Sequence, residues 1–230
     1  MTFALIQARQ SSSRFNNKIF QDLKGNYVID WVIDRISLSN KIKKIYILIP
    51  NNKKNLRLKK YLKDRKINFF VGSENDVLER FYLCAKKFTI NEFVRICADN
   101  PIICPNEIDK LIEFYQKNKC DYAYNHIPIN NNYPNGLGAE MSNFRVLELL
   151  HKKAKKREHR EHIFNYLWDN KDTFSIKTFN HYNSKLNFPN IRLDINYKKD
   201  LQKLNKLNIS IYEKSEKIVS KYIINFNNEY

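Results

Sequence analysis

Short apolar runs alternate with amphipathic stretches along the first half of the sequence, and this rhythm restricts the fold more than any other feature. The apolar runs cover residues 3–8, 44–50, 67–72, 92–97 and 121–125, and the stretches between them cover 26–38, 53–65, 75–88 and 105–118. In the last stretch Ile108, Leu111, Ile112 and Tyr115 recur at helical spacing behind Pro105. Strands that alternate with helices predict an α/β fold with a mostly parallel central sheet flanked by helices.

The rhythm breaks after Asn125. Residues 126–138 ("HIPINNNYPNGLG") are rich in asparagine, proline and glycine and predict a long loop, which in a compact domain is often functional. Beyond it, helices are expected at 143–155, 159–169, 197–207 and 213–226, and strands at 174–179 and 190–195. Neither an internal repeat nor a linker-like composition interrupts the sequence, so residues 1–230 are expected to form one domain.

The formal net charge is +17, from 41 lysines and arginines against 24 acidic residues. Such a charge is compatible with nucleic acid, an anionic membrane or acidic small molecules as partners. Most of the lysines, however, are scattered over expected helix faces, as in "NKKNLRLKKYLKDRK" (52–66), and such runs are usually solvated. Because no RNP, helix-turn-helix or zinc-finger pattern accompanies the charge, the sequence disfavours nucleic-acid binding.

Cysteine usage and hydropathy bear on the compartment. The four cysteines, at 84, 97, 104 and 120, form no CxxC pair and lack zinc-ligand spacing, which is typical of a reducing compartment. His159 and His162 lie on one expected helix face, but no third ligand accompanies them, so zinc is not expected. The longest apolar runs, such as "IYILI" (45–49), are far shorter than the ~20 residues of a membrane-spanning helix. Without a signal-peptide pattern, the sequence predicts a cytoplasmic location.

The stretch "IQARQSSSRFNNK" (6–18) follows the first expected strand and carries three cations, Arg9, Arg14 and Lys18. Ligands of open α/β sheets bind beyond the carboxyl ends of strands, which is where this stretch is expected to lie. No glycine occurs before Gly25, so neither a GxGxxG fingerprint nor a Walker loop is present. Two interpretations stay open: the cations and the serines at 11–13 bind a triphosphate through side chains, or the stretch is an ordinary basic surface turn.

Six segments along the chain resemble the motifs of one known family. They are "IQARQSSSRFNNK" (6–18), "GSENDVLERFY" (72–82), "VRICADNPIICPNEID" (94–109), "YPNGLGAEMSNFRVLE" (133–148), "REHIFNYLW" (160–168) and "IRLDINYKKDL" (191–201). Together they resemble the cytidylyltransferases that activate acidic sugars, of the spore-coat-polysaccharide type and related to the CMP-KDO and CMP-sialate (acylneuraminate) synthetases. One segment alone is a weak signal, but six in the right order and spacing are specific.

The resemblance implies a single-domain nucleotidyltransferase fold that is Rossmann-like and of the glycosyltransferase-A type. It implies a Mg²⁺-dependent enzyme that moves CMP from CTP to an acidic sugar or phosphorylated polyol, releases pyrophosphate and serves surface polysaccharide or glycoconjugate biosynthesis. Residues 1–125 would bind the nucleotide, 126–190 the acceptor and a second subunit of a homodimer, and 191–230 would return to the sheet. Two alternatives stay open: a nucleotidyltransferase for another base or a sugar-phosphate acceptor, and a non-catalytic nucleic-acid-binding domain.

The resemblance also implies the residues of the site. The nucleotide-binding set is Gln7, Ala8, Arg9, Ser12, Ser13, Arg14, Lys18, Ser73, Asp76, Arg80 and Asp99, of which Arg14, Lys18 and Asp99 would be catalytic. The acceptor-binding set is Tyr133, Asn135, Gly136, Glu140, Arg160, Glu161 and His162. Asp99, at the end of an expected strand, and Asp194 would hold Mg²⁺, which prefers carboxylate oxygens.

For several of these residues a structural role is the alternative. Ser73 and Asp76 have the pattern of a helix N-terminus, and Asp99 has that of a turn before Pro101. The run "REHREH" (157–162) has the composition of a solvated helix face.

The sequence departs from the family pattern at two places. Asn16 and Asn17 replace a proline and a glycine of the family's first loop, while the cations keep their register. Gly138 stands where the family has aspartate, which removes a carboxylate from the expected acceptor side. We therefore expect charge neutralisation to be retained, the first loop to be mobile without nucleotide, and the second departure to bear on the acceptor.

Overall fold

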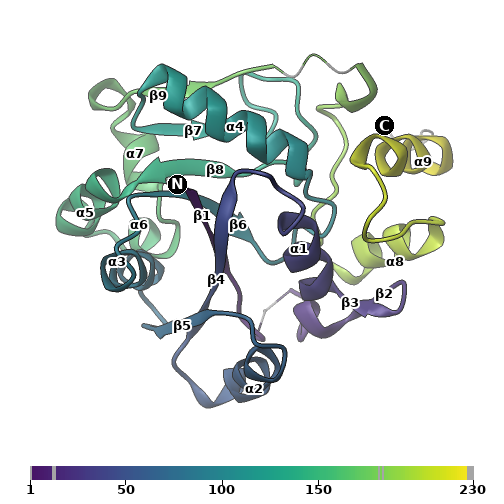
Figure 1. Cartoon of the computed structure of the whole chain (residues 1–230), viewed down its shortest axis with the longest axis horizontal. Helices are drawn as coiled ribbons and strands as arrows, with labels where there is room; N and C mark the ends of the chain where they lie inside the picture. Colours follow the sequence, from purple (N-terminus) through teal and green to yellow (C-terminus); the bar gives the residue numbers. More distant parts are fainter. Residues whose placement is uncertain (1, 12–13, 181, 183, 227–230) are drawn as a thin grey trace.

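The computed structural model describes residues 2–11, 14–180, 182 and 184–226. A seven-stranded sheet forms its centre, with the strand order β5-β4-β1-β6-β8-β7-β9 (Figure 1). The strands are β1 (Thr2–Gln7), β4 (Ile42–Pro50), β5 (Phe69–Gly72), β6 (Glu92–Cys97), β7 (Tyr122–Tyr124), β8 (Glu140–Asn143) and β9 (Ile176–Thr178). Of these strands β8 alone runs antiparallel to its neighbours, β6 and β7. The expected α/β fold with a mostly parallel sheet is confirmed.

Helices cover both faces of the sheet. One face carries α1 (Val28–Ile36), α2 (Leu56–Asp64) and α4 (Pro105–Asn118), and the other carries α3 (Val77–Lys87), α5 (Phe144–Lys153) and α7 (Asn165–Asp169). Strand β1 supplies both cores: Ala4 and Ile6 join the first and Leu5 the second, because successive side chains of a strand point to opposite faces. Among the described helices none combines the length and apolarity that crossing a bilayer requires.

A third apolar cluster joins the C-terminal part of the chain to the flank of α1. Figure 1 shows α8 (Lys198–Lys206) and α9 (Ser215–Phe226) beside α1 and the small hairpin of β2 (Asp22–Leu23) and β3 (Asn26–Tyr27). Single turns of 3₁₀ helix occur at η1 (Lys18–Phe20), η2 (Lys53–Asn55), η3 (Lys171–Thr173) and η4 (Ser184–Leu186).

A fully buried arginine fastens α1 to this C-terminal part. The Arg35 guanidinium donates to the carbonyl oxygens of Ile103 (2.8 Å), Ile211 (2.7 Å) and Glu213 (2.9 Å) and to Ser215 Oγ (2.6 Å). Burial lowers the pKa of Arg35. A buried charge of this kind is tolerated only where its donors are satisfied, and here the C-terminal segment supplies three of the four acceptors.

The strand order creates a switch point between β1 and β6. After β1 the chain moves outward through β4 to β5, and it then returns to the opposite side of β1 to form β6. Since β1 and β6 are parallel, their carboxyl ends, at Gln7 and Cys97, lie side by side. Such points are where open α/β sheets bind their ligands.

Two expected elements were wrong. Residues 190–195 form an isolated bridge between Arg192 and Asn135 rather than a strand. Their backbone bonds run to two different segments, because Leu193 N donates to Asn135 O (2.9 Å) and Ile195 N donates to Asp99 O (2.8 Å). The expected helix at 159–169 is broken into α6 (Arg157–Glu161) and α7, since His162 leaves the helical region at φ −111° and ψ 94°.

Two further elements had no expected counterpart. Strand β8, with the sequence "EMSN", is short and lacks a clear apolar alternation. The hairpin β2–β3 lies where the helix at 26–38 was expected to begin, and Gly25 makes its turn at φ 81°. The functional division into 1–125, 126–190 and 191–230 and the homodimer stay predictions.

Candidate active site

A cavity of about 230 Å³ lies at the switch point, beyond the carboxyl ends of β1 and β6. Among its lining residues are seven that the sequence placed in the site: Gln7, Arg9, Arg14, Lys18, Asp99, Glu161 and His162. The lining further includes Ile19, Val77, Arg95, Cys97 and Ala98. Burial raises the pKa of the Cys97 thiol to about 12, so this cysteine faces the cavity as a neutral group.

The first loop is tied down at both ends. Ala8 N donates to Leu48 O (3.1 Å), Gln10 N donates to Asn55 Oδ1 (2.8 Å), and Asn17 N donates to Gln10 O (3.2 Å). Asn17 lies in the left-handed region at φ 53° and ψ 26°. Asparagine is among the few residues other than glycine that enter this region readily, so Asn17 keeps the conformation that the family's glycine allows. Ser12 and Ser13 lie outside the described residues.

Lys18 joins three segments that are far apart in sequence. Its Nζ donates to Asp99 Oδ2 at 2.8 Å and to the main-chain oxygen of Ile195 at 2.6 Å. The Lys18 side chain is 12% exposed and that of Asp99 is 29% exposed. The first loop, the end of β6 and the segment after residue 190 therefore meet at the ammonium group of Lys18.

Asp194 lies beside this junction. Its carboxylate accepts hydrogen bonds from Arg192, at 3.2 and 2.9 Å, and from the Asn196 side chain. Gly136, at φ 86°, packs against its backbone, and a Cβ on that glycine would lie only 2.7 Å from Asp194 N. The glycine thus permits the close approach that places Asp194 next to the Asp99 segment.

Gly136→Ala is expected to destabilise the fold and to lower turnover together. The left-handed φ alone costs about 1–2 kcal/mol for a residue with a Cβ, and the clash with Asp194 N adds to it and shifts the Asp194 segment. Gly25→Ala is the matched control, because Gly25 has φ 81° but nothing within 4 Å of its would-be Cβ. Urea unfolding and turnover of both variants check this. Equal stability losses with activity kept in both would contradict the proposed coupling.

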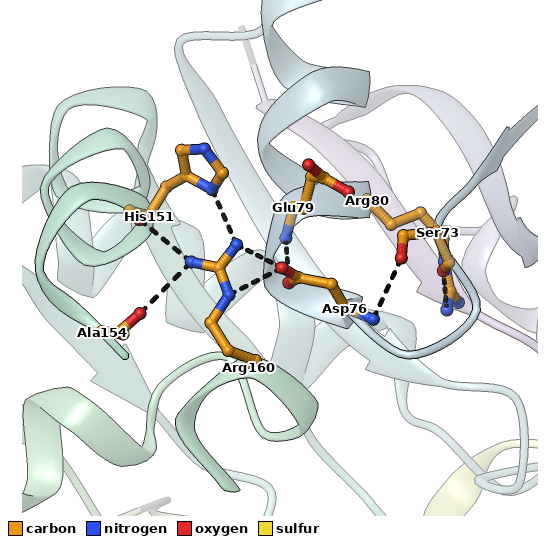
Figure 2. Close-up of polar contacts among 7 residues, drawn as sticks. All are labelled: Ser73, Asp76, Glu79, Arg80, His151, Ala154 and Arg160. Atoms are coloured by element: carbon orange, nitrogen blue, oxygen red, sulfur yellow. Dashed lines mark hydrogen bonds and ion pairs between the residues drawn. The ribbon is translucent and has the colours of Figure 1, made fainter. Parts of the chain in front are cut away.

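Figure 2 shows the turn that precedes α3. Asp76 caps the helix by accepting from Glu79 N at 2.8 Å, and Ser73 Oγ accepts from Asp76 N at 3.2 Å. The Arg80 side chain folds back and donates to Ser73 O at 2.9 and 2.7 Å. Asp76 thus lies at the helix N-terminus as the N-cap itself, and the turn presents the next residue, Val77, to the cavity, while a nucleotide-binding role of Ser73 and Asp76 stays a prediction.

Arg160 connects this turn to α5 and α6. Its guanidinium donates to the Asp76 carboxylate through Nε (2.7 Å) and Nη2, and its Nη1 donates to His151 O at 2.9 Å (Figure 2). The next two residues, Glu161 and His162, line the cavity, whereas Arg160 does not. Arg160 therefore positions a wall of the cavity.

Positive charges lie close together near the turn before α3, where Asp76 and Glu74 offset them in part. Burial lowers the pKa of Arg80 to about 10, and repulsion from Arg9 acts in the same direction. Nη1 of Arg80 is buried, and the described part of the chain offers it no hydrogen-bond partner. Arg80 itself is not among the residues that line the cavity, so its role as a nucleotide-binding residue stays a prediction.

Arg95, which was not among the expected site residues, lines the cavity from the middle of β6. It donates to Gln7 Oε1 at 3.1 Å and forms an ion pair with Glu140 of β8, whose second oxygen accepts from Tyr122 OH at 2.7 Å. Burial would raise the pKa of Glu140, but Arg95, His126 and the hydrogen bond from Tyr122 together outweigh it, so the pKa lies below its ordinary value. An arginine inside the apolar run "EFVRIC" was the available signal, since a buried charge needs a partner.

Four residues expected at the acceptor lie behind the cavity. Glu140 is buried against Arg95, and Tyr133 is fully buried, with its hydroxyl donating to Glu107 Oε2 at 2.5 Å. Asn135 and Gly136 are occupied by the backbone contacts to residues 191–194. None of the four is among the residues that line the cavity.

At the second departure from the family pattern, Gly138, the space that a side chain would need is occupied by Asn125. A Cβ at Gly138 would lie 2.2 Å from both Asn125 O and Asn125 Oδ1. The Asn125 side chain is itself fixed, because it accepts from Ala139 N at 2.9 Å and donates to Glu107 O at 3.0 Å. An aspartate at 138 would therefore displace this buried amide.

The two histidines near 160 point to different places. His159 is buried, and its Nε2 lies 2.8 Å from Asp169 Oδ2, whereas His162 lines the cavity. A ligand atom of Glu158 lies within 4.8 Å of those of His159 and Asp169. An ordinary histidine–carboxylate pair accounts for this arrangement.

Solved structures share this architecture. A cytidylyltransferase from Leptospira borgpetersenii superposes with a TM-score of 0.87 at 23% identity, covering 99% of this chain and 94% of its own. A CMP:2-keto-3-deoxy-manno-octonic acid synthetase, solved in complex with CTP, superposes with a TM-score of 0.67 at 12% identity. The match covers 89% of this chain and 97% of that synthetase. The fold is that of the nucleotidyltransferases.

Sequence comparisons specify the family. The family model described as cytidylyltransferase matches residues 3–220, so the chain belongs to the cytidylyltransferase family. The uncharacterized protein MJ1063 of Methanocaldococcus jannaschii is 33% identical over 172 residues, which cover 75% of this chain and 69% of that protein. The spore coat polysaccharide biosynthesis protein SpsF of Bacillus subtilis is 24% identical over 208 residues, which cover 88% of this chain and 84% of SpsF.

Proposed function

We propose that the enzyme moves CMP from CTP to an oxygen of an acidic sugar or phosphorylated polyol, with Mg²⁺, in the biosynthesis of surface polysaccharide or glycoconjugate. The observation that carries this is the convergence of Arg9, Arg14 and Lys18 on one cavity with Asp99. Family membership supports the nucleotide, as does the CTP bound to the structurally similar synthetase. The similarity to SpsF supports the pathway.

In the proposed reaction the acceptor oxygen attacks the α-phosphorus of CTP. The bond from this phosphorus to the oxygen that bridges to the β-phosphate breaks, and pyrophosphate leaves with the negative charge. The loop cations Arg9, Arg14 and Lys18 neutralise that charge as it develops, which contributes to rate more than to ground-state binding.

Asp99 and Asp194 are the residues that would hold Mg²⁺, and their chemistry fits a hard cation. The Asp99 carboxylate lines the cavity and already accepts a cationic group, the ammonium of Lys18. Asp194 is not among the lining residues, but it precedes Ile195, whose main chain contacts Asp99 and Lys18, and its carboxylate is oriented by Arg192 and Asn196. When bound, the ion supplies charge neutralisation to phosphate oxygens.

We assign the acceptor side to cavity residues on β1, β6 and the end of α6. Gln7, Arg95, Glu161 and His162 line it. A guanidinium beside an amide suits a carboxylate or phosphate of the acceptor, because it can donate two parallel hydrogen bonds. Arg160 would act through Asp76, by holding Glu161 and His162 in place.

Calorimetric titration with CTP, UTP, ATP and GTP in the presence of Mg²⁺ tests the nucleotide. CTP is expected to bind at least about tenfold more tightly than the other three, a difference of about 1.4 kcal/mol. Arg14→Ala is the control: it should weaken all four nucleotides alike, since it contacts phosphates and not the base. Equal wild-type affinities, or a preference for GTP, would refute the assignment to CTP. Pyrophosphate release with a panel of acidic sugars and polyol phosphates then identifies the acceptor.

A further inference from the structure

The cation that lies at Asp99 in this structure is the protein's own. Lys18 Nζ sits between Asp99 Oδ2, at 2.8 Å, and the main-chain oxygen of Ile195, at 2.6 Å, with 12% of its side chain exposed. A carboxylate oxygen next to a backbone carbonyl oxygen is also a typical pair of ligands for a hard divalent cation.

The charged residues around the cavity favour the position of Lys18 at Asp99. Arg9, Arg14, Lys18 and Arg95 line it, together with the carboxylates Asp99 and Glu161. Arg95 is already paired with Glu140 from behind. Among the described contacts of the three loop cations, the one with a cavity carboxylate is the ion pair of Lys18 with Asp99.

A divalent ion on Asp99 and the Lys18 ammonium in its present position exclude each other. An ion that takes Asp99 Oδ2 and the Ile195 carbonyl oxygen as ligands would need the two atoms that Lys18 Nζ contacts, and like charges a few ångströms apart in a partly buried site repel strongly. The role proposed for Lys18 in the reaction, at the leaving pyrophosphate, likewise requires it to leave Asp99.

We propose that Lys18 is a placeholder cation: in the free enzyme it occupies the metal's oxygen ligands, and the arriving metal–nucleotide complex displaces it onto the triphosphate. This inference rests on the metal site of the proposed function, to which it adds the competition and the carbonyl oxygen of Ile195. The free enzyme then binds a divalent ion weakly, and metal and nucleotide bind together, since the triphosphate gives the displaced ammonium a new partner.

Binding of Mn²⁺ to the free protein, followed by the EPR signal of unbound Mn²⁺, tests the competition without nucleotide or acceptor. Lys18→Met keeps the aliphatic stem and removes the charge. It is expected to raise the Mn²⁺ affinity on the order of tenfold, the scale of one lost charge-assisted hydrogen bond. Lys18→Arg, which retains a cation, should bind Mn²⁺ as wild type does.

Arg14→Met is the matched control, because it removes the same charge from the same cavity, and among the described contacts no bond joins Arg14 to Asp99. Its Mn²⁺ affinity should rise less than about threefold, as expected for a screened longer-range effect. In a Lys18→Met/Asp99→Asn double variant the gain should vanish. An unchanged affinity in Lys18→Met, or equal gains in Lys18→Met and Arg14→Met, overturns the proposal.

A measurement on the wild-type protein keeps the proposal testable even if Lys18→Met folds poorly. Reductive methylation of Lys18, mapped by mass spectrometry, should be slow in the free protein and faster at saturating Mg²⁺, because the displaced amine leaves its two oxygen partners. A rate independent of Mg²⁺ overturns the proposal. An enzyme that prefers CTP but shows no competition at Lys18 loses only this inference, whereas loss of the CTP preference counts against the proposed function.

Discussion

Replacing Asp99 by asparagine is expected to lower turnover of CTP by at least about 10²-fold, the scale of removing one preorganised electrostatic group. The amide oxygen of asparagine can still accept a hydrogen bond from Lys18, but it lacks the negative charge that holds a divalent ion. Pyrophosphate release at saturating CTP and Mg²⁺ measures the effect. Because the Asp99 side chain is 29% exposed, the free energy of unfolding should change little.

Asp64→Asn serves as the control for Asp99→Asn. Asp64 is an exposed residue of α2 whose carboxylate pairs with Lys60, and its loss should leave turnover within about twofold of wild type, as for most surface changes. An Asp99→Asn enzyme with near-normal turnover would remove Asp99 from the catalytic machinery.

Arg95→Met is expected to cost about 3–5 kcal/mol of unfolding free energy at pH 7, because it leaves the Glu140 carboxylate buried without its partner. In the wild-type protein the pKa of Glu140 lies below its ordinary value of 4.5, so the ion pair stabilises the fold above that pH and is lost as the pH falls through the folded pKa. In the variant the charge of Arg95 no longer opposes burial, so this pKa rises. The loss of stability should therefore be largest at neutral pH and should shrink toward pH 5.

Urea unfolding at pH 7 and pH 5 checks this, with the Arg95→Met/Glu140→Gln double variant beside it. The second substitution removes the buried charge and should recover a large part of the stability lost at pH 7. A loss below about 1 kcal/mol, the size of an exposed ion pair, or a loss that does not vary with pH, would show that Arg95 and Glu140 are not coupled as described.

Elements with strong apolar periodicity could be predicted from the sequence alone. The helix expected at 105–118 is α4 with the same bounds, because Pro105 is compatible with the first helical position and the apolar residues face one core. Residues 190–195 alternate between apolar and polar side chains as a strand does. Their backbone, however, bonds to Asn135 and Asp99 in two different segments, so no strand forms. Strand β8 was not predicted because it is four residues long and its sequence has no clear strand pattern. Its pairing with β6 and β7 stabilises it as a strand.

The charged groups of the site could be predicted, whereas their partners could not. Arg9, Arg14, Lys18 and Asp99 stand out because cations and a carboxylate follow strand ends. No local pattern indicates that Lys18 bonds to Ile195, 177 positions away, or that Arg160 reaches back to Asp76, 84 positions away. Arg95 and Glu140 meet across β6 and β8, so their pairing could not be inferred while β8 was unknown.

The buried guanidinium of Arg35 also sets the order in which the chain can mature during synthesis. Three of its four acceptors belong to residues 211–215, which are synthesised long after α1 because they lie 176 to 180 positions further along the chain. Until then α1 carries a charged group that cannot be buried at an acceptable cost, since each hydrogen bond to a charge contributes about 1.5–3 kcal/mol. Ile195, the backbone partner of Lys18 and Asp99, also emerges late. A nascent chain therefore cannot complete the candidate site until residues 195–215 have emerged, although Arg9, Arg14 and Lys18 are made long before them.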